Sequence, residues 1–277
     1  MLFPTLLVVA LVAAYPFGRT VYDSFTDAVF GQATTHFIGL QNYQDLINDV
    51  FFRNSVLETL KFTVITVFCE FVLGMIVALV VNSKFRGRGA MRAAMLIPWA
   101  IVTVISASMW KLMYNDVYGV INDVLQKVGL ISHYVAFTSL PSTSLYAAAA
   151  IDIWKTTPFM ALLLLAGLQV IPGDTYEAAK VDGASAIQQF LRITLPLLRP
   201  AILVALIFRT LDALRVFDVF FVLFGNRPDT MTMAVYDQEN IVNFGLIGYG
   251  AAISVGIFVI IGIFVIAYVS TLRVERT

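Results

Sequence analysis

Apolar residues gather into six long runs that carry few charges, separated by shorter polar stretches. A helix needs roughly 20 mostly apolar residues to cross the hydrocarbon layer of a membrane. The runs cover residues 2–21, 60–81, 91–113, 145–168, 197–224 and 246–272. This pattern predicts an all-α integral membrane protein with six transmembrane helices, in a single transmembrane domain over residues 1–277.

Finer patterns predict shorter features. In the last run, Gly248, Ala252 and Gly256 recur every four residues, a spacing typical of a helix face that packs closely on a neighbour. Helical periodicity over 42–52 predicts an interfacial amphipathic helix, and a second short helix is expected at 120–128. Both connections are expected to cap the bundle.

The composition agrees with a membrane location. Hydrophobic residues make up 59% of the chain and charged residues only 13%, about half the charged share of soluble domains, which excludes a soluble enzyme. The 18 basic and 18 acidic residues cancel, which argues against nucleic-acid binding. Cys69 is the single cysteine, so no intramolecular disulfide forms. We expect no catalytic residues and no metal site.

Basic residues indicate the orientation of the spans. Lys84, Arg86, Arg88 and Arg92 crowd one short connection without an acid, and such loops stay cytoplasmic. Six spans then place both termini in the cytoplasm, in the plasma (inner) membrane. The first run could instead be a cleaved signal peptide, although it has neither a basic lead nor an A-x-A site.

The connection over 171–196 lies on the cytoplasmic side in this topology. Pro172 and Gly173 end the preceding helix, and Asp174 or Thr175 can cap a new one. The new helix has two consecutive alanines and is followed by a glycine that allows a turn. A short helix with one flat face is typical of a docking element.

The same connection contains EAAKVDGA, followed by Ile193, Leu195 and Pro196. This pattern resembles the EAA loop of binding-protein-dependent ABC importer permeases. Further segments agree, among them RGRGAMRAAMLIPWA, DIWKTTPFMALLLLAGLQ and FGLIGYGAA. Together they resemble the carbohydrate-uptake branch, specifically the first permease of the pair in maltose-type and trehalose-type importers. The resemblance implies the type I ABC importer permease architecture, with a cytoplasmic EAA coupling helix.

The resemblance also implies partners and a mechanism. The coupling contact to the ATPase is expected at the motif residues Glu177, Ala178, Ala179, Asp182 and Gly183. The implied partners are a second homologous permease, two ATPase subunits and an extracellular solute-binding protein or lipoprotein. ATP and Mg would bind to the ATPase subunits, because this chain has no GxxxxGK[ST] motif. The implied substrate is a di- or oligosaccharide, with trehalose the first choice and another sugar or a polyol left open.

Charged residues within the spans are candidates for the substrate pathway or for structural ion pairs. Asp152 and Lys155 are neighbours on one helix face, and Pro158 nearby frees a backbone carbonyl. Charges at steps of three in the fifth span spiral around the helix, so they cannot all face one cavity. The candidate pathway residues are Asp152, Trp154, Lys155, Arg209, Asp212, Arg215 and Tyr249.

Two other classes of protein remain as alternatives. An ion-gradient-driven secondary transporter would use Glu70 and the intramembrane acid–base pairs as coupling sites. Such carriers usually contain internal repeats, and none is evident in this sequence. A membrane-embedded enzyme is disfavoured, because no cluster of nucleophiles, histidines or metal ligands is apparent.

Overall fold

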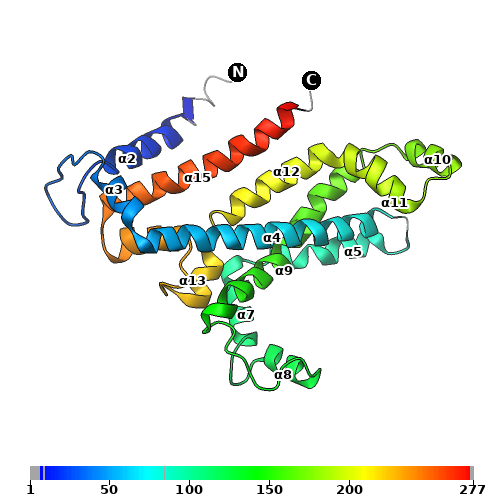
Figure 1. Ribbon diagram of the computed structural model, residues 1–277, viewed down its shortest axis with the longest axis horizontal. Coiled ribbons are helices and arrows are strands. Elements are labelled where there is room, and N and C mark those ends of the chain that lie inside the picture. The colour runs from blue at the N-terminus through cyan, green and yellow to red at the C-terminus, as the bar shows by residue number, and fades with distance from the viewer. Residues whose placement is uncertain (1–6, 9, 84, 275–277) are drawn as a thin grey trace. The chain divides into compact units, whose positions relative to one another are not determined.

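The computed structural model describes residues 7–8, 10–83 and 85–274, and these residues are mainly helical (Figure 1). Within them no strand forms beyond an isolated bridge between Thr26 and Phe37. The all-α fold class predicted from the apolar runs is confirmed. The long helices are α4 (Val50–Asn82), α9 (Pro141–Leu168), α12 (Leu195–Ala213) and α15 (Ile247–Val274).

Shorter helices connect the long ones. Before α4 lie η1 (Ala10–Ala14), α2 (Tyr15–Asp23) and α3 (Gln41–Asn48). Between α4 and α9 lie α5 (Arg88–Met95), α6 (Ile97–Ala100), α7 (Thr103–Met113) and α8 (Val120–Lys127). After α9 come α10 (Gly173–Val181), α11 (Ala186–Gln189) and η2 (Phe190–Thr194). After α12 come α13 (Asp218–Phe224), α14 (Met233–Gln238) and η3 (Glu239–Asn243).

By length and composition, four helical segments of the described chain can cross a membrane. They are Val50–Asn82, Pro141–Val170, Ala186–Phe224 and Ile247–Tyr268. A fifth crossing is formed if Arg88–Ala100 and Thr103–Met113 count as one broken span, bent by 87°. Residues 2–6 and 9 of the first expected span, 2–21, lie outside the described residues, and the span continues as η1 and α2.

Two of the expected spans are interrupted. The run 91–113 breaks at Ile101 and Val102, whose backbones are extended with ψ of 136° and 134°. Ile101, Val102 and Thr103 are consecutive β-branched residues, which lose side-chain freedom in a helix and so tolerate a break. The run 197–224 is likewise divided, because α12 ends at Ala213 and α13 begins at Asp218. Apolar composition predicted where the chain crosses but not where its helices break.

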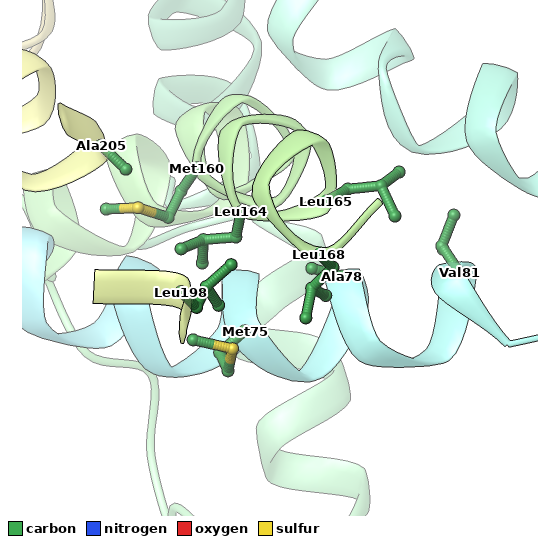
Figure 2. Packing of buried hydrophobic residues seen from close by; sticks show 9 residues of the cluster. All are labelled: Met75, Ala78, Val81, Met160, Leu164, Leu165, Leu168, Leu198 and Ala205. Atoms are coloured by element: carbon green, nitrogen blue, oxygen red, sulfur yellow. The ribbon is translucent and has the colours of Figure 1, made fainter. Parts of the chain in front are cut away.

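The chain forms two compact units. Unit 1 comprises Met1–Thr59 and Arg215–Phe264, and unit 2 comprises Leu60–Leu214 and Val265–Thr277. Three helices of unit 2 contribute to one apolar core (Figure 2). The core residues are Met75, Ala78 and Val81 from α4, Met160, Leu164, Leu165 and Leu168 from α9, and Leu198 and Ala205 from α12.

Glycines allow these three helices to approach closely. A Cβ atom at Gly74 of α4 would lie only 2.7 Å from Cγ of Met160 on α9. A Cβ atom at Gly167 of α9 would lie 2.7 Å from Cδ1 of Leu198 on α12, and it would also contact Ala201 of the same helix. Such distances are too short for carbon atoms, so α4, α9 and α12 pack through faces that only glycine permits.

Unit 1 is held together by polar contacts of its loops. The side-chain amide of Asn42 donates to the carbonyl oxygens of Ser24 and Thr26, at 2.9 and 2.8 Å. On α15, Gly248 lies against the backbone of Thr26, and Gly256 faces Leu46. The predicted close packing is therefore found at Gly248, where a Cβ atom would lie 2.0 Å from the carbonyl oxygen of Thr26, whereas Gly256 has room for ordinary contact at 3.5 Å.

Candidate functional site

Two features of unit 2 have the properties of functional sites: the exposed segment that follows α9, and a charged cluster inside the helix bundle. In the first, α10 begins at Gly173, with Pro172 as its N-cap and no side-chain cap. The prediction that Asp174 or Thr175 caps this helix is therefore wrong. Proline at the cap position carries no donor or acceptor side chain, and Asp174 instead places its charge in the first helical turn.

Gly183 terminates α10 in a specific way. Its φ is +78°, in the left-handed region that favours glycine. The Gly183 N–H donates to the carbonyl of Lys180, and the Ala184 N–H donates to the carbonyl of Ala179 at 2.9 Å. This pair of bonds is the Schellman motif, which satisfies the last carbonyls of a helix. The glycine in EAAKVDGA thus fixes the end of the exposed helix.

No residue of α10 is buried. Glu177, Ala178, Val181 and Asp182 are exposed, with the valine 89% accessible. An exposed apolar residue beside small alanines and two acids leaves a face that another protein can approach closely. The structure therefore leaves most of the motif on the surface of the unit.

The opposite side of α10 is tied to its own bundle. The hydroxyl of Tyr176 lies 2.9 Å from the hydroxyl of Thr194, a nearly buried residue of η2. Around this contact is a mostly apolar pocket of about 420 Å³, with Leu79 of α4 and Phe190 of η2 in its wall. This contact links α10 to η2, which leads directly into α12.

The second feature is a buried ionic cluster that links α4, α9 and α12. Nε of Arg209 lies 2.6 Å from Glu70, and its Nη2 lies 2.9 Å from the same carboxylate. Nη2 also lies 3.1 Å from Asp152. Thr156 donates its hydroxyl to Glu70 at 2.5 Å. The Arg209 side chain is 2% exposed and that of Glu70 is fully buried, so the pair is shielded from solvent.

Asp212 extends this cluster to the surface of the unit. Its carboxylate contacts Nη1 of Arg209, but its side chain is 67% exposed. Three carboxylates therefore surround one guanidinium, and the outermost is accessible. The structure brings together three of the candidate pathway residues, Asp152, Arg209 and Asp212, as one ionic cluster. Arg209 itself has every nitrogen engaged by an acid.

Two further candidates lie on α9 beside the cluster. Trp154 packs edge-on against Trp110 of α7, with ring centroids 5.6 Å apart. Lys155 is nearly buried, and its Nζ lies 3.5 Å from the carbonyl of Trp99 at the end of α6. The spacing argument paired Lys155 with Asp152, whereas the structure gives Asp152 the shorter contact to Arg209. Both α9 residues thus face the broken span α6–α7.

The remaining two candidates belong to unit 1. Arg215 is exposed just after α12. The hydroxyl of Tyr249 donates to Asp49 at 2.7 Å, and Tyr236 donates to the same carboxylate oxygen. Burial raises the pKa of Asp49, but the two tyrosine hydroxyls and two backbone N–H groups outweigh it and hold that pKa below its ordinary value. These hydrogen bonds give Tyr249 a structural partner.

Glu70 and Thr156 complete the cluster, and neither was among the candidate pathway residues. A signal for Glu70 existed in the sequence, because a lone acid in an apolar run needs a partner of opposite charge. That partner, Arg209, is 139 residues away, so the sequence could not identify it. Among the described residues, no group of three or more His, Cys, Asp or Glu side chains could hold a metal ion.

The sequence matches a protein family and several named relatives. Residues 70–276 match the family described as binding-protein-dependent transport system inner membrane component. The trehalose/maltose transport system permease protein MalF of Thermococcus litoralis is 43% identical over all of this chain and 93% of its own length. The trehalose transport system permease protein SugA of Mycobacterium tuberculosis is 38% identical, over 92% of this chain and 81% of its own.

Solved structures share the fold. A chain of a bacterial ABC transporter that imports the acidic polysaccharide alginate superposes with a TM-score of 0.85 at 24% identity, covering 99% of this chain and 93% of its own. A chain of a bacterial alginate ABC transporter, solved in complex with an alginate pentasaccharide-bound periplasmic protein, superposes with a TM-score of 0.82 at 24% identity, covering 97% of this chain and 91% of its own. From the family match and the fold together, we conclude that this integral membrane chain belongs to the binding-protein-dependent transport system inner membrane components, the permeases of ABC importers.

Proposed function

We propose that this chain is the first permease subunit of an ATP-driven sugar importer and that α10 is its contact with an ATPase subunit. The observation that carries this proposal is α10 itself, an exposed helix with the EAA motif on its surface and a glycine-fixed end. We favour ATP-driven transport over transport coupled to an ion gradient, because the chain belongs to a family of ABC importer permeases.

Glu177, Ala178, Ala179, Asp182 and Gly183 have separate roles in the proposed contact. The alanines allow a partner to approach the helix, and Glu177 and Asp182 offer charges to basic side chains of the ATPase. Gly183 keeps the end of the helix in a fixed geometry. Each of these roles needs a helix that reaches out of the bundle.

The path from α10 into the membrane follows covalent and packing connections. Only four residues separate the end of α9 from the start of α10, and Tyr176 binds η2 at the start of α12. Glycine-mediated packing and the Arg209 cluster join α9 and α12 to α4. We therefore propose that α4, α9 and α12 move as one block when the ATPase subunits close.

The proposed substrate is a disaccharide such as trehalose. Support comes from the names of relatives in Thermococcus litoralis and Mycobacterium tuberculosis that transport trehalose or trehalose and maltose. A sugar needs hydrogen-bonding groups for its hydroxyls and aromatic faces for its ring. Asp152, Asp212 and Trp154 provide such groups on and beside the cluster, with Lys155, Arg209, Arg215 and Tyr249 as further candidates for the pathway.

The proposed assembly contains a second permease, two ATPase subunits that bind ATP and Mg, and an extracellular solute-binding protein. The alginate importer, whose permease shares this fold, has been solved with a periplasmic binding protein. In this assembly both termini of the chain lie in the cytoplasm, on the same side of the plasma membrane as α10.

Uptake by the reconstituted importer tests the proposal. The complex is placed in liposomes with ATP inside and solute-binding protein outside, and entry of radiolabelled trehalose is compared with that of maltose, sucrose and sorbitol. We expect ATP-dependent entry of trehalose that unlabelled trehalose competes away. Entry that does not depend on ATP would contradict the transport mechanism, and ATP-dependent entry of another sugar would contradict only the substrate.

A further inference from the structure

The segment between α7 and α9 exposes a stripe of apolar side chains on its short helix α8. Its helix α8 turns Asn122 inward, where it is completely buried. Val120, Val124 and Val128 are exposed at helical spacing, whereas the apolar Leu125 is partly buried. Soluble helices show the opposite pattern, with apolar residues inside and polar residues facing water. The exposed valine stripe of α8 is therefore suited to an apolar environment on that face.

The segment satisfies its own backbone hydrogen bonds. The amide of Asn122 donates to the carbonyl oxygens of Asn115 and Val135, at 3.2 and 3.0 Å, and its oxygen accepts from the Val135 N–H. The side-chain oxygen of Asn115 accepts from the N–H groups of Val117 and Tyr118. Polar backbone groups must be satisfied internally in this way wherever water cannot reach them.

Charge in the segment is also compensated locally. Asp123 and Lys127 form an ion pair at 2.7 Å on α8 itself. Between residues 114 and 140 the other formal charge is Asp116, so the segment carries no basic excess that would bind anionic headgroups. The face that carries the exposed valines is therefore apolar rather than charged.

The segment follows directly on a membrane-crossing element that also exposes apolar side chains. Ile105 and Leu112 of α7 are 61% and 62% exposed, and α7 is half of the bent pair long and apolar enough to cross a membrane. After α7, the exposed apolar residues are Val117, Val120, Val124, Val128 and Leu130, each between 51% and 77% accessible. Tyr118, also exposed, has the amphipathic ring typical of membrane interfaces.

We infer that α8 and its flanking turns lie in the interfacial layer of the bilayer, with Val120, Val124 and Val128 in contact with phospholipid acyl chains. A soluble partner fits this surface less well, because such a partner leaves and would expose a contiguous apolar patch to water. Lipid covers the patch permanently. In this inference the segment, which was expected to cap the bundle, anchors the end of the broken span through a lipid contact.

Fluorescence from a single labelled position tests this inference in the assembled importer. Cys69→Ala removes the native thiol, and Val124→Cys is labelled with the environment-sensitive dye NBD in nanodiscs of phosphatidylcholine. Gln126→Cys is the matched control, because it is also exposed on α8 but points roughly 160° away from Val124 at 3.6 residues per turn. Lipids carrying a doxyl spin label then report whether the dye touches acyl chains.

We expect the dye at Val124 to emit at shorter wavelength than the dye at Gln126 and to be quenched at least twofold more by doxyl lipid. Val120→Cys, one turn away on the same face, repeats the measurement if the first variant does not fold. Equal emission in water-like surroundings at both positions, with quenching by iodide, would overturn the inference. Shielding of Val124 only after the solute-binding protein is added would overturn it in favour of a protein contact.

Discussion

Arg209 of α12 and Glu70 of α4 form a bidentate ion pair, with nitrogen–oxygen distances of 2.6 and 2.9 Å, inside the bundle of unit 2. Both side chains are at most 2% exposed to solvent. Since Asp152 of α9 shares the same guanidinium, the pair joins three helices that otherwise touch through apolar side chains and glycines. The cluster therefore specifies how these helices are placed against one another.

Removing the positive charge should damage this unit severely. Arg209→Met leaves Glu70 and Asp152 buried without a counter-charge, and breaking such a buried pair costs about 3–5 kcal/mol. We expect a large loss of thermal stability in detergent. Glu70→Gln should cost much less, because the amide oxygen still accepts from Arg209 and Asp152 remains beside it. A double variant, Glu70→Met with Arg209→Met, should be more stable than Arg209→Met alone; equal stability of these two variants would contradict a direct pairing.

A substitution at Gly183 tests the backbone conformation at the end of α10 without causing a steric clash. A Cβ at this position meets no atom within 4 Å, so Gly183→Ala is penalised only by its φ of +78°. A cost of about 1 kcal/mol is usual for a left-handed non-glycine residue, and we expect weaker sugar-stimulated ATPase activity of the complex.

Gly173→Ala is the matched control for this variant. It lies at the other end of the same helix, also has open space, and has no positive φ. Stimulation of the ATPase should be unchanged in this control. An equal loss in both variants would show that α10 tolerates no added methyl group, and the backbone argument would fail.

The hydroxyl of Tyr176 should matter for coupling more than for assembly. Tyr176→Phe keeps the ring against the pocket but removes the hydrogen bond to Thr194. We expect the complex to assemble normally, with basal ATPase activity retained and fewer sugar molecules imported per ATP hydrolysed. Thr194→Val removes the other partner and should give the same ratio. A normal transport-to-ATP ratio in both variants would exclude this contact from the coupling path.

Asp237 should make the stability of unit 1 depend on pH. Burial raises the pKa of Asp237 to about 6 from an ordinary value of 3.8, although the Ser254 hydroxyl donates to its carboxylate at 2.7 Å. The protonated form is therefore favoured by folding. Its contribution to stability is full below about pH 4 and is lost as the pH rises through about 6.

Asp237→Asn mimics the protonated side chain and should remove this dependence. We expect the melting temperature of the natural chain to fall more steeply between pH 5 and pH 7.5 than that of Asp237→Asn, measured in the same detergent. Parallel curves for the two proteins would show that Asp237 is not held in a burial-raised state.

Local patterns in the sequence were enough to predict the helical membrane fold and the short helix at residues 120–128, where α8 lies. The helix expected over 42–52 is instead divided, because Asp49 accepts from the N–H groups of Phe51 and Phe52 and starts α4 anew. Asp49 lies directly before the start of α4, and its partners Tyr236 and Tyr249 are far away in the sequence. Periodicity alone does not contain that information.

The candidate site was predictable to a similar degree. The steps of three between charges in the fifth run predicted that they cannot all face one cavity, and the side chains of Arg209 and Asp212 are indeed 2% and 67% exposed. The partner of Arg209 could not be deduced, since Glu70 and Asp152 are brought to it by the packing of three helices. Pairing between distant residues depends on tertiary structure, which local spacing does not encode.

Copurification of the tagged chain from its native membranes in mild detergent tests the central claim most directly. The natural chain is compared with Ala178→Trp on the exposed face of α10 and with Val170→Trp, an exposed apolar position just before it. The account predicts that a P-loop ATPase and a second permease copurify with the natural chain and with Val170→Trp, and that Ala178→Trp loses the ATPase. Recovery of the natural chain alone, or retention of the ATPase by Ala178→Trp at the natural level, would contradict coupling through α10.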